Sequence, residues 1–140
     1  MTPKEKRNIT ENLPIYKCTV RYVHTLLEYS KNYNRDFKRT LCDSMCRNAL
    51  ELPLLLQKIN VEIDTSKKWG YISDFIAKFG AIRFMTQESC ELKCISRGQL
   101  GVLSLMEEEI GRQATGWKHH IESLLLKKEE EGLLGAIEEP

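Results

Sequence analysis

Four of the five cysteines in this chain form two pairs with three residues between the thiols, CDSMC at 42–46 and CELKC at 90–94. Four thiolates can bind a structural zinc ion tetrahedrally. In two antiparallel helices, residues equally far from the connecting turn lie at the same height along the helix axes. A turn is expected near residues 62–66, so the two cysteine pairs would lie at about the same height. One interpretation is therefore a zinc site, whose candidate ligands are Cys42, Cys46, Cys90 and Cys94.

The other interpretation is that these cysteines are small buried residues. Structural zinc sites usually use tight knuckles in loops, whereas both pairs fall inside predicted helices. Cys42 and Cys46 lie about 100–140° from the centre of their helix's apolar face, so their thiols need not converge with the second pair. Because free cysteine is commonly buried, we favour this interpretation and predict neither a bound metal nor a cofactor.

Other residue patterns that could perform catalysis are weak. The chain contains no P-loop, G-x-G-x-x-G or H-E-x-x-H motif. His119 and His120 are adjacent, so on a helix they point about 100° apart and cannot chelate together. The acidic run at 107–109 is interpreted as a solvated face, because no Glu-x-x-His pair accompanies it as a di-iron bundle would need. We therefore predict that the chain is not an enzyme.

Composition is that of one globular domain. The chain has 140 residues, of which 41% are hydrophobic and 29% charged. The charged start, MTPKEKRNITE, lacks the apolar core of a signal peptide. The longest wholly apolar run, 52–56, is far too short to span a bilayer. We expect a cytoplasmic protein with no membrane partner, and reduced cytoplasmic thiols argue against a disulfide framework.

Helical periodicity dominates the chain, and strand signals are nearly absent. The first predicted helix spans 12–32, with Pro14 in its first turn, and the second spans 35–60. Leu50 and Leu54 lie opposite the apolar line of the second helix, which predicts deep burial or contact with another subunit.

The second half predicts two more helices. An N-cap among residues 64–66 starts the third helix, which ends near Leu92. Ser96 and Gln99 form a capping box that starts the fourth. Four helices with short turns predict an all-α fold, an antiparallel up-and-down four-helix bundle.

Charge and composition divide the chain into three parts. We predict an N-terminal arm at 1–11, the bundle at 12–126 and a flexible acidic tail at 127–140. Residues 1–100 hold 17 Lys and Arg against 11 Asp and Glu, whereas residues 101–140 hold 4 against 9. This asymmetry is weak evidence for an anionic partner, and a solvated surface with uneven ends is the alternative.

Three stretches carry a family resemblance: ENLPIYK at 11–17, YNRDFKRTLCDSMCRNALELPLLLQKIN at 33–60 and EEIGRQATGWKHH at 108–120. They resemble the four-helix-bundle family that contains proteins encoded in intervening sequences of 23S ribosomal RNA genes and the accessory variability determinant of diversity-generating retroelements. Arg47, Ala49 and Pro53 are similar to both branches. The pattern from Ile110 to Trp117 is closer to the retroelement accessory branch.

The resemblance implies a ring-shaped homopentamer whose basic outer surface binds nucleic acid, RNA or DNA, and a partner reverse transcriptase. Such an accessory protein supports template-primed cDNA synthesis in mutagenic retrohoming and has no catalytic activity of its own. The exposed stripe of Leu50 and Leu54 fits an oligomer interface. The alternative is a structural or protein-interaction bundle of the intervening-sequence type, with no retroelement role.

Phosphate binding requires clustered lysine and arginine side chains. Arg35, Lys38 and Arg39 share one helix face next to the first turn. Arg83 falls near the centre of the third helix's apolar stripe, where its charge must be paired, must snorkel outward or must serve an interface. The alternative for each cation is a role in solubility. The predicted nucleic-acid-binding residues are Lys17, Arg21, Lys31, Arg35, Lys38, Arg39, Lys67, Lys68, Arg83 and Arg112.

Overall fold

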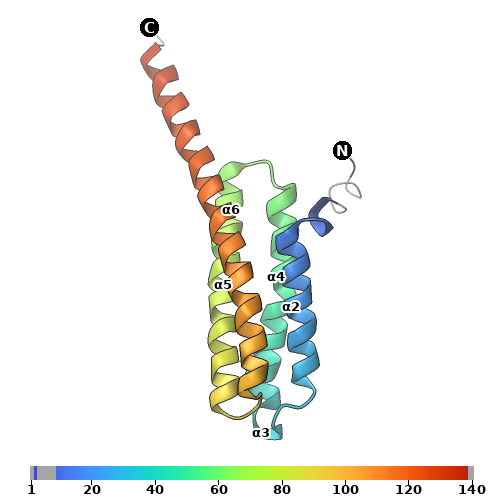
Figure 1. Ribbon diagram of the computed structural model, residues 1–140. Helices are drawn as coiled ribbons and strands as arrows, with labels where there is room; N and C mark the ends of the chain where they lie inside the picture. Colours follow the sequence, from blue (N-terminus) through green and yellow to red (C-terminus); the bar gives the residue numbers. More distant parts are fainter. Residues whose placement is uncertain (1, 3–8, 139–140) are drawn as a thin grey trace.

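The computed structural model describes residues 2 and 9–138, with side chains described as far as residue 134. All regular elements of this part of the chain are helical, which confirms the predicted all-α class. The long helices are α2 (Pro14–Ser30), α4 (Asp43–Val61), α5 (Thr65–Glu91) and α6 (Arg97–Glu138), and they lie side by side in Figure 1. A short helix, α3 (Arg35–Phe37), and a π-helix, η1 (Lys38–Cys42), connect α2 to α4.

Consecutive long helices run in opposite directions (Figure 1). Helix α2 packs against α4 and α6, and α5 packs against the same two helices, so the four surround one core. The α2–α4 and α5–α6 connections consequently lie at one end of the bundle, and the α4–α5 turn lies at the other. None of the helices in the described part of the chain combines the length and the hydropathy that a bilayer crossing requires.

Local signals in the sequence explain where the helices begin. Asp64 caps α5 by accepting a hydrogen bond from the backbone N–H of Ser66. The capping box at the start of α6 is confirmed: the Ser96 hydroxyl accepts from the Gln99 N–H at 3.1 Å, and the Gln99 amide oxygen accepts from the Ser96 N–H at 2.9 Å.

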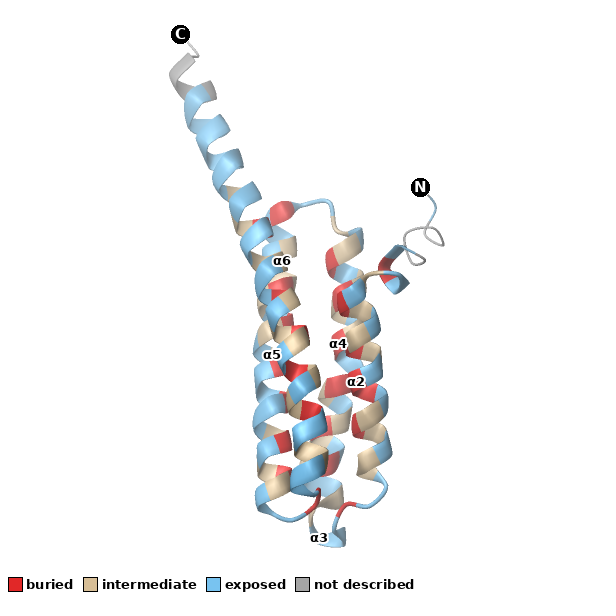
Figure 2. Cartoon of the chain, viewed as in Figure 1, coloured by how far each residue is buried: buried red, intermediate tan, exposed pale blue. Residues whose placement is uncertain are grey.

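The apolar faces meet in a continuous core (Figure 2). Helix α4 buries Met45, Ala49, Leu52, Leu56 and Ile59, a regular 3–4 residue repeat. The largest side chains that are fully enclosed come from all four long helices: Tyr22, Leu26, Met45, Leu52, Leu56, Ile59, Ile72, Phe75, Ile82, Leu103, Ile110 and Ile121.

The segment predicted to be a flexible tail, 127–140, is helical as far as Glu138, because α6 continues through it. Leucine, lysine and glutamate, all good helix formers, occupy every position of 124–131. This part of α6 projects beyond the other helices, and residues 126–134 are all exposed (Figures 1 and 2). We call residues 124–138 the α6 extension.

The predicted N-terminal arm lies mostly outside the described residues. Residues 9–11 are helical, and Thr10 is buried. The Asn60 amide donates a hydrogen bond to the Thr10 hydroxyl at 2.7 Å, which ties this segment to the end of α4.

We predict that Ser96→Ala lowers the free energy of unfolding by about 1 kcal/mol, because it removes the acceptor for the Gln99 N–H at the start of α6. Urea unfolding followed by circular dichroism measures the change. Thr115→Ala, at an exposed interior position of α6, is the matched control and should not destabilise. Equal effects of the two substitutions would show that the cap is not needed.

Candidate functional site

Two basic turns meet at one end of the bundle. Residues 31–39 lie in the α2–α4 connection, residues 92–98 comprise the α5–α6 connection and the first two residues of α6, and both segments lie at the lower end in Figure 1. Together these segments contain one acid, Asp36, and six cations: Lys31, Arg35, Lys38, Arg39, Lys93 and Arg97. We call these six residues the basic end.

Two of the six cations stabilise the α2–α4 turn itself. Lys31 forms an exposed ion pair with Glu28 at 3.0 Å. The Lys38 ammonium donates a hydrogen bond to the carbonyl oxygen of Ser30, the last residue of α2. A lysine at a helix C-terminus also interacts favourably with the helix dipole, so Lys38 acts mainly as a capping residue.

The other four cations of the basic end are available to a ligand. Arg35, Arg39, Lys93 and Arg97 are exposed, and none has an ion-pair partner within 4.0 Å among the described residues. Sequence reasoning missed Lys93 and Arg97. The signal that could have found them is topological, because the first and third turns of an up-and-down bundle lie at the same end.

Lys93 has an unusual backbone conformation. Its φ of 63° is in the left-handed region, the only such value for a non-glycine residue in the described chain. Hydrogen bonds from the N–H of Lys93 to the carbonyl of Cys90 and from the N–H of Cys94 to the carbonyl of Ser89 complete a Schellman motif. Glycine, which has no Cβ, is the usual residue at this position, so the helix end carries a lysine where glycine would be less strained.

The remaining predicted cations do not join the basic end. Lys67 and Lys68 lie in the first turn of α5, at the opposite end of the bundle. Lys17 and Arg21 are exposed one turn apart along α2. The ten predicted residues therefore do not form a single continuous surface.

Arg83 and Arg112 are paired with carboxylates. Both oxygens of Glu109 accept from the Arg112 guanidinium at 2.7 Å. Arg83 lies off the centre of the buried face of α5, and its charge is both paired and close to water, two of the three outcomes predicted for it: its side chain is 46% exposed, and its Nε lies 3.7 Å from Glu107. The guanidinium carbon sits 5.9 Å from the centre of the Phe79 ring, so the side chain leaves the core along this ring and reaches water.

The interpretation of residues 107–109 as a solvated face is wrong for Glu107, which is 1% exposed. Glu107 follows Leu103 and precedes Ile110 and Ala114 at helical spacing, and this periodicity was the signal for its burial. The Tyr22 hydroxyl donates to its Oε2 at 2.6 Å, and the Thr86 hydroxyl lies 3.0 Å from the same oxygen.

Burial dominates the electrostatics of this contact. Removal from water raises the pKa of Glu107, although hydrogen bonds from Tyr22 and Thr86 and the charge of Arg83 oppose the shift. Burial and the neighbouring carboxylate also raise the pKa of Tyr22, which therefore keeps its proton. The Glu107 carboxyl group thus links α6 to α2 and α5.

The four cysteines of the two C-x-x-x-C motifs are free thiols. Cys42 and Cys94 are buried, and Cys46 and Cys90 are partly exposed. Burial, with the neighbouring Cys46, raises the pKa of Cys42 to about 11, so this thiol stays protonated at neutral pH. Among the described residues, no cluster of three or more histidine, cysteine, aspartate or glutamate side chains has an arrangement that could bind a metal ion.

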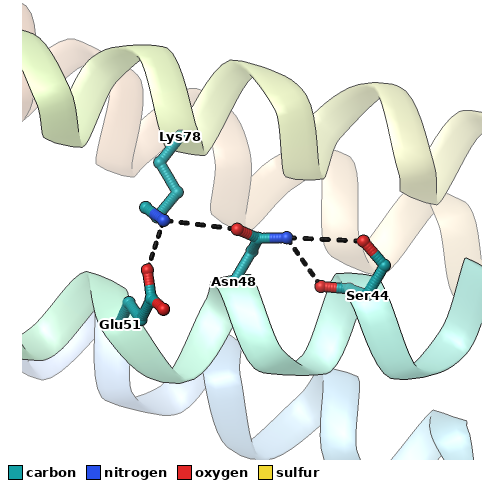
Figure 3. A network of polar contacts seen from close by, with 4 residues as sticks. All are labelled: Ser44, Asn48, Glu51 and Lys78. Carbon is teal, nitrogen blue, oxygen red and sulfur yellow. Dashed lines mark hydrogen bonds and ion pairs between the residues drawn. The ribbon is translucent and has the colours of Figure 1, made fainter.

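Leu50 and Leu54, the predicted interface residues, are 52% and 56% exposed on α4. Leu54 borders a groove of about 540 Å³ between α4 and α5, together with Leu55, Ala77 and Ala81. A polar network contributes to the lining of this groove: the Lys78 ammonium binds Glu51 and the amide oxygen of Asn48 (Figure 3). The amide nitrogen of Asn48 donates in turn to the Ser44 carbonyl at 2.8 Å.

Comparison of the chain with protein-family models, with curated proteins and with solved structures gives no match.

We predict that Glu107→Gln becomes progressively more stabilising, relative to the natural chain, as pH rises. The pKa of Glu107 is higher in the folded than in the unfolded state, so the folded state binds more protons between these two values and loses stability as pH rises through them. Each tenfold change in the acid dissociation constant corresponds to about 1.4 kcal/mol.

Urea unfolding of both chains from pH 4 to pH 8 measures this difference. Glu109→Gln is the control, because the exposed Glu109 has a pKa lowered by its hydrogen bond from Arg112 and should show the opposite trend. A stability difference between Glu107→Gln and the natural chain that does not change with pH would contradict the prediction.

Proposed function

We propose that this chain is a non-enzymatic nucleic-acid-binding accessory protein of a diversity-generating retroelement. In this proposal it is an antiparallel up-and-down four-helix bundle that assembles as a ring-shaped homopentamer. It binds template RNA or cDNA and the partner reverse transcriptase, and so supports mutagenic retrohoming. The observation that carries the nucleic-acid part is the basic end, where two turns place six cations beside one acid.

The chemistry of the basic end fits a phosphate backbone. Arg35 and Arg39 come from one turn and Lys93 and Arg97 from the other, so the positive charge spans the end of the bundle. Binding of several phosphates releases condensed counterions, which provides affinity without reading a base sequence. Arginine also binds phosphate through two parallel hydrogen bonds, and four cations distributed over two segments can contact several phosphates of one polyanion.

The oligomer is supported by the outer face of α4. Leu50 and Leu54 are one turn apart and exposed, and Leu54 continues into the groove with Leu55, Ala77 and Ala81. A subunit that covers this face would remove apolar surface from water. The reverse transcriptase partner rests on the resemblance of residues 11–17, 33–60 and 108–120 to the accessory proteins.

A second candidate is a structural or protein-interaction bundle of the intervening-sequence type. It is favoured by the pairing of Lys31, Arg83 and Arg112 with carboxylates of the same chain and by the near-neutral sequence pI of 7.6. Such a protein would form oligomers without measurable nucleic-acid binding.

We predict that reversing the charge of the four available cations of the basic end weakens binding of a fluorescently labelled RNA by about tenfold or more. The variant combines Arg35→Glu, Arg39→Glu, Lys93→Glu and Arg97→Glu. The reason is that several phosphates are no longer neutralised by the protein. The dependence of log affinity on log salt concentration should also become shallower, by about one for each such phosphate. Fluorescence anisotropy at several salt concentrations measures both effects.

The matched control replaces Lys17, Arg21, Lys67 and Lys68 by glutamate. This control changes the net charge equally, but its four positions lie away from the basic end. This control should keep most of the affinity. A larger decrease of affinity in the control than in the basic-end variant would show that the nucleic acid binds elsewhere on the protein. No salt-dependent binding by the natural chain would favour the interaction bundle.

We also predict that Leu50→Glu with Leu54→Glu reduces the assembly to a smaller species without unfolding it. Both side chains are already half exposed, so the folded subunit is little destabilised when they become charged. Sedimentation equilibrium measures the mass, and circular dichroism checks the helices. Leu105→Glu, at a leucine on α6 that is 72% exposed, is the control. An unchanged mass in the double variant would exclude this face as the subunit contact.

A further inference from the structure

The hydrogen bonds around Glu107 can be completed in both of its protonation states. The Thr86 hydroxyl lies 3.0 Å from Oε2 of Glu107 and 2.8 Å from the carbonyl oxygen of Arg83, and it has one proton for these two acceptors. As a carboxylate, Glu107 accepts this proton from Thr86 and another from Tyr22 at 2.6 Å. As a neutral acid, Glu107 donates its own proton to the Thr86 oxygen, and Thr86 then donates to the Arg83 carbonyl. Protonation therefore needs only a rotation of the Thr86 hydroxyl.

The two states differ in the charge that faces Arg83. Helix α6 packs against α2 and α5. From α2, the titratable group that faces Glu107 is Tyr22, and from α5 the charged group is Arg83. Burial and the neighbouring carboxylate raise the pKa of Tyr22, which keeps its proton, and arginine keeps its charge at all physiological pH values. Glu107 is thus the member of this cluster whose charge changes with pH.

Arg83 is held by attraction to Glu107 and not by a direct hydrogen bond. Its Nε lies 3.7 Å from Oε1 of Glu107, which is longer than a hydrogen bond, and its side chain is 46% exposed. The guanidinium passes over α6 at Gly111, where the position of a Cβ would be 3.9 Å from Nη1. Its other contact is the ring of Phe79, 5.9 Å away. Without the charge on Glu107, this side chain has a ring to rest on and water beside it.

We propose that proton uptake by Glu107 releases Arg83 from its ion pair and presents the guanidinium at the surface, where it can bind a phosphate group of a ligand. Glu107 is in this respect a positioning residue, because it acts through Arg83.

The direction of the pH dependence follows from the burial of Glu107. Burial raises the pKa of this carboxyl group, so it takes up its proton at a pH where exposed glutamates are still ionised. Arg83 is free below the raised value and is drawn back as pH rises through it. The coupling is reciprocal: an anion that binds Arg83 removes a charge that lowers the pKa of Glu107, and so raises that pKa further.

Nuclear magnetic resonance of the full chain from pH 4 to pH 8 tests the release without any ligand. The Nε–H signal of Arg83 should change with the same midpoint as the carboxyl carbon of Glu107. In Glu107→Gln, which imitates the neutral acid, the Arg83 signal should keep its low-pH position throughout. Arg112 is the control, because its partner Glu109 has a lowered pKa and should titrate at lower pH.

Two results would overturn the proposal. One is an Arg83 signal that does not change at the midpoint of Glu107, and the other is the same change of this signal in Glu107→Gln. Circular dichroism of the variant, with the helix content of the natural chain expected, shows that the bundle remains folded.

Binding of the labelled RNA tests the consequence for a ligand, and this part rests on the proposed function. At a pH above the midpoint of Glu107, Glu107→Gln should bind about two- to fivefold more tightly than the natural chain, as expected when one partly exposed ion pair no longer competes. Adding Arg83→Gln should abolish this gain. Glu129→Gln, in the α6 extension, changes the net charge equally and should bind like the natural chain.

Equal affinities of Glu107→Gln and Glu129→Gln would overturn the binding of a phosphate group by Arg83. Failure of every chain to bind RNA would instead contradict the proposed function, and the resonance titration would still decide whether Glu107 controls Arg83.

Discussion

Short turns constrain how the four apolar helix faces can leave water together. The α4–α5 and α5–α6 connections are a few residues long, and the longer α2–α4 connection is taken up by α3 and η1, so α2, α4, α5 and α6 alternate in direction around one core. The same constraint brings the first and third turns to one end, although they are about sixty residues apart in the sequence. The basic end is thus a consequence of core burial: the connection that holds Arg35 and Arg39 lies at the same end of the bundle as Lys93 and Arg97 because the helices between them pack as they do.

Polar contacts inside the bundle complement this apolar packing. Glu107 on α6 contacts Tyr22 on α2 and Thr86 on α5, so one buried carboxyl group links three helices. Near the basic end, the Tyr33 hydroxyl donates to Ser89 at 2.7 Å and fixes the α2–α4 connection against α5. Buried polar groups are stable only when their partners are in place, so these contacts favour one helix register over its neighbours.

Helix starts could be predicted from the sequence, because capping depends on residues a few positions apart. Ser96 with Gln99 and Asp64 with Ser66 are of this kind. Periodicity also found most of the core, but it gives the direction of a side chain and not the width of the buried face. The pattern therefore predicts a central position for Arg83, which reaches water, and the charge of Glu107 suggests exposure although it is buried.

Other features have no local signal. The end of α6 is not predicted correctly because a charged segment that covers no core resembles a fraying tail, although its residues are good helix formers. The π-helix at Lys38–Cys42 results from a shift in backbone hydrogen bonding that leaves no residue signature. Lys93 and Arg97 belong to the basic end only because the order and direction of the helices bring the two connections to the same end. The residue pattern of a single helix carries no information on that arrangement.

The central claim is that a polyanion binds the end of the bundle where the first and third turns meet. Backbone amide chemical shifts of the full chain, recorded during titration with a short RNA, locate the bound surface directly. Binding at the basic end predicts that the shifts concentrate at residues 31–39 and 92–98 and reverse when salt is added. Shifts concentrated instead at Lys67, Lys68 and the exposed side of α2, or their absence throughout, would contradict it.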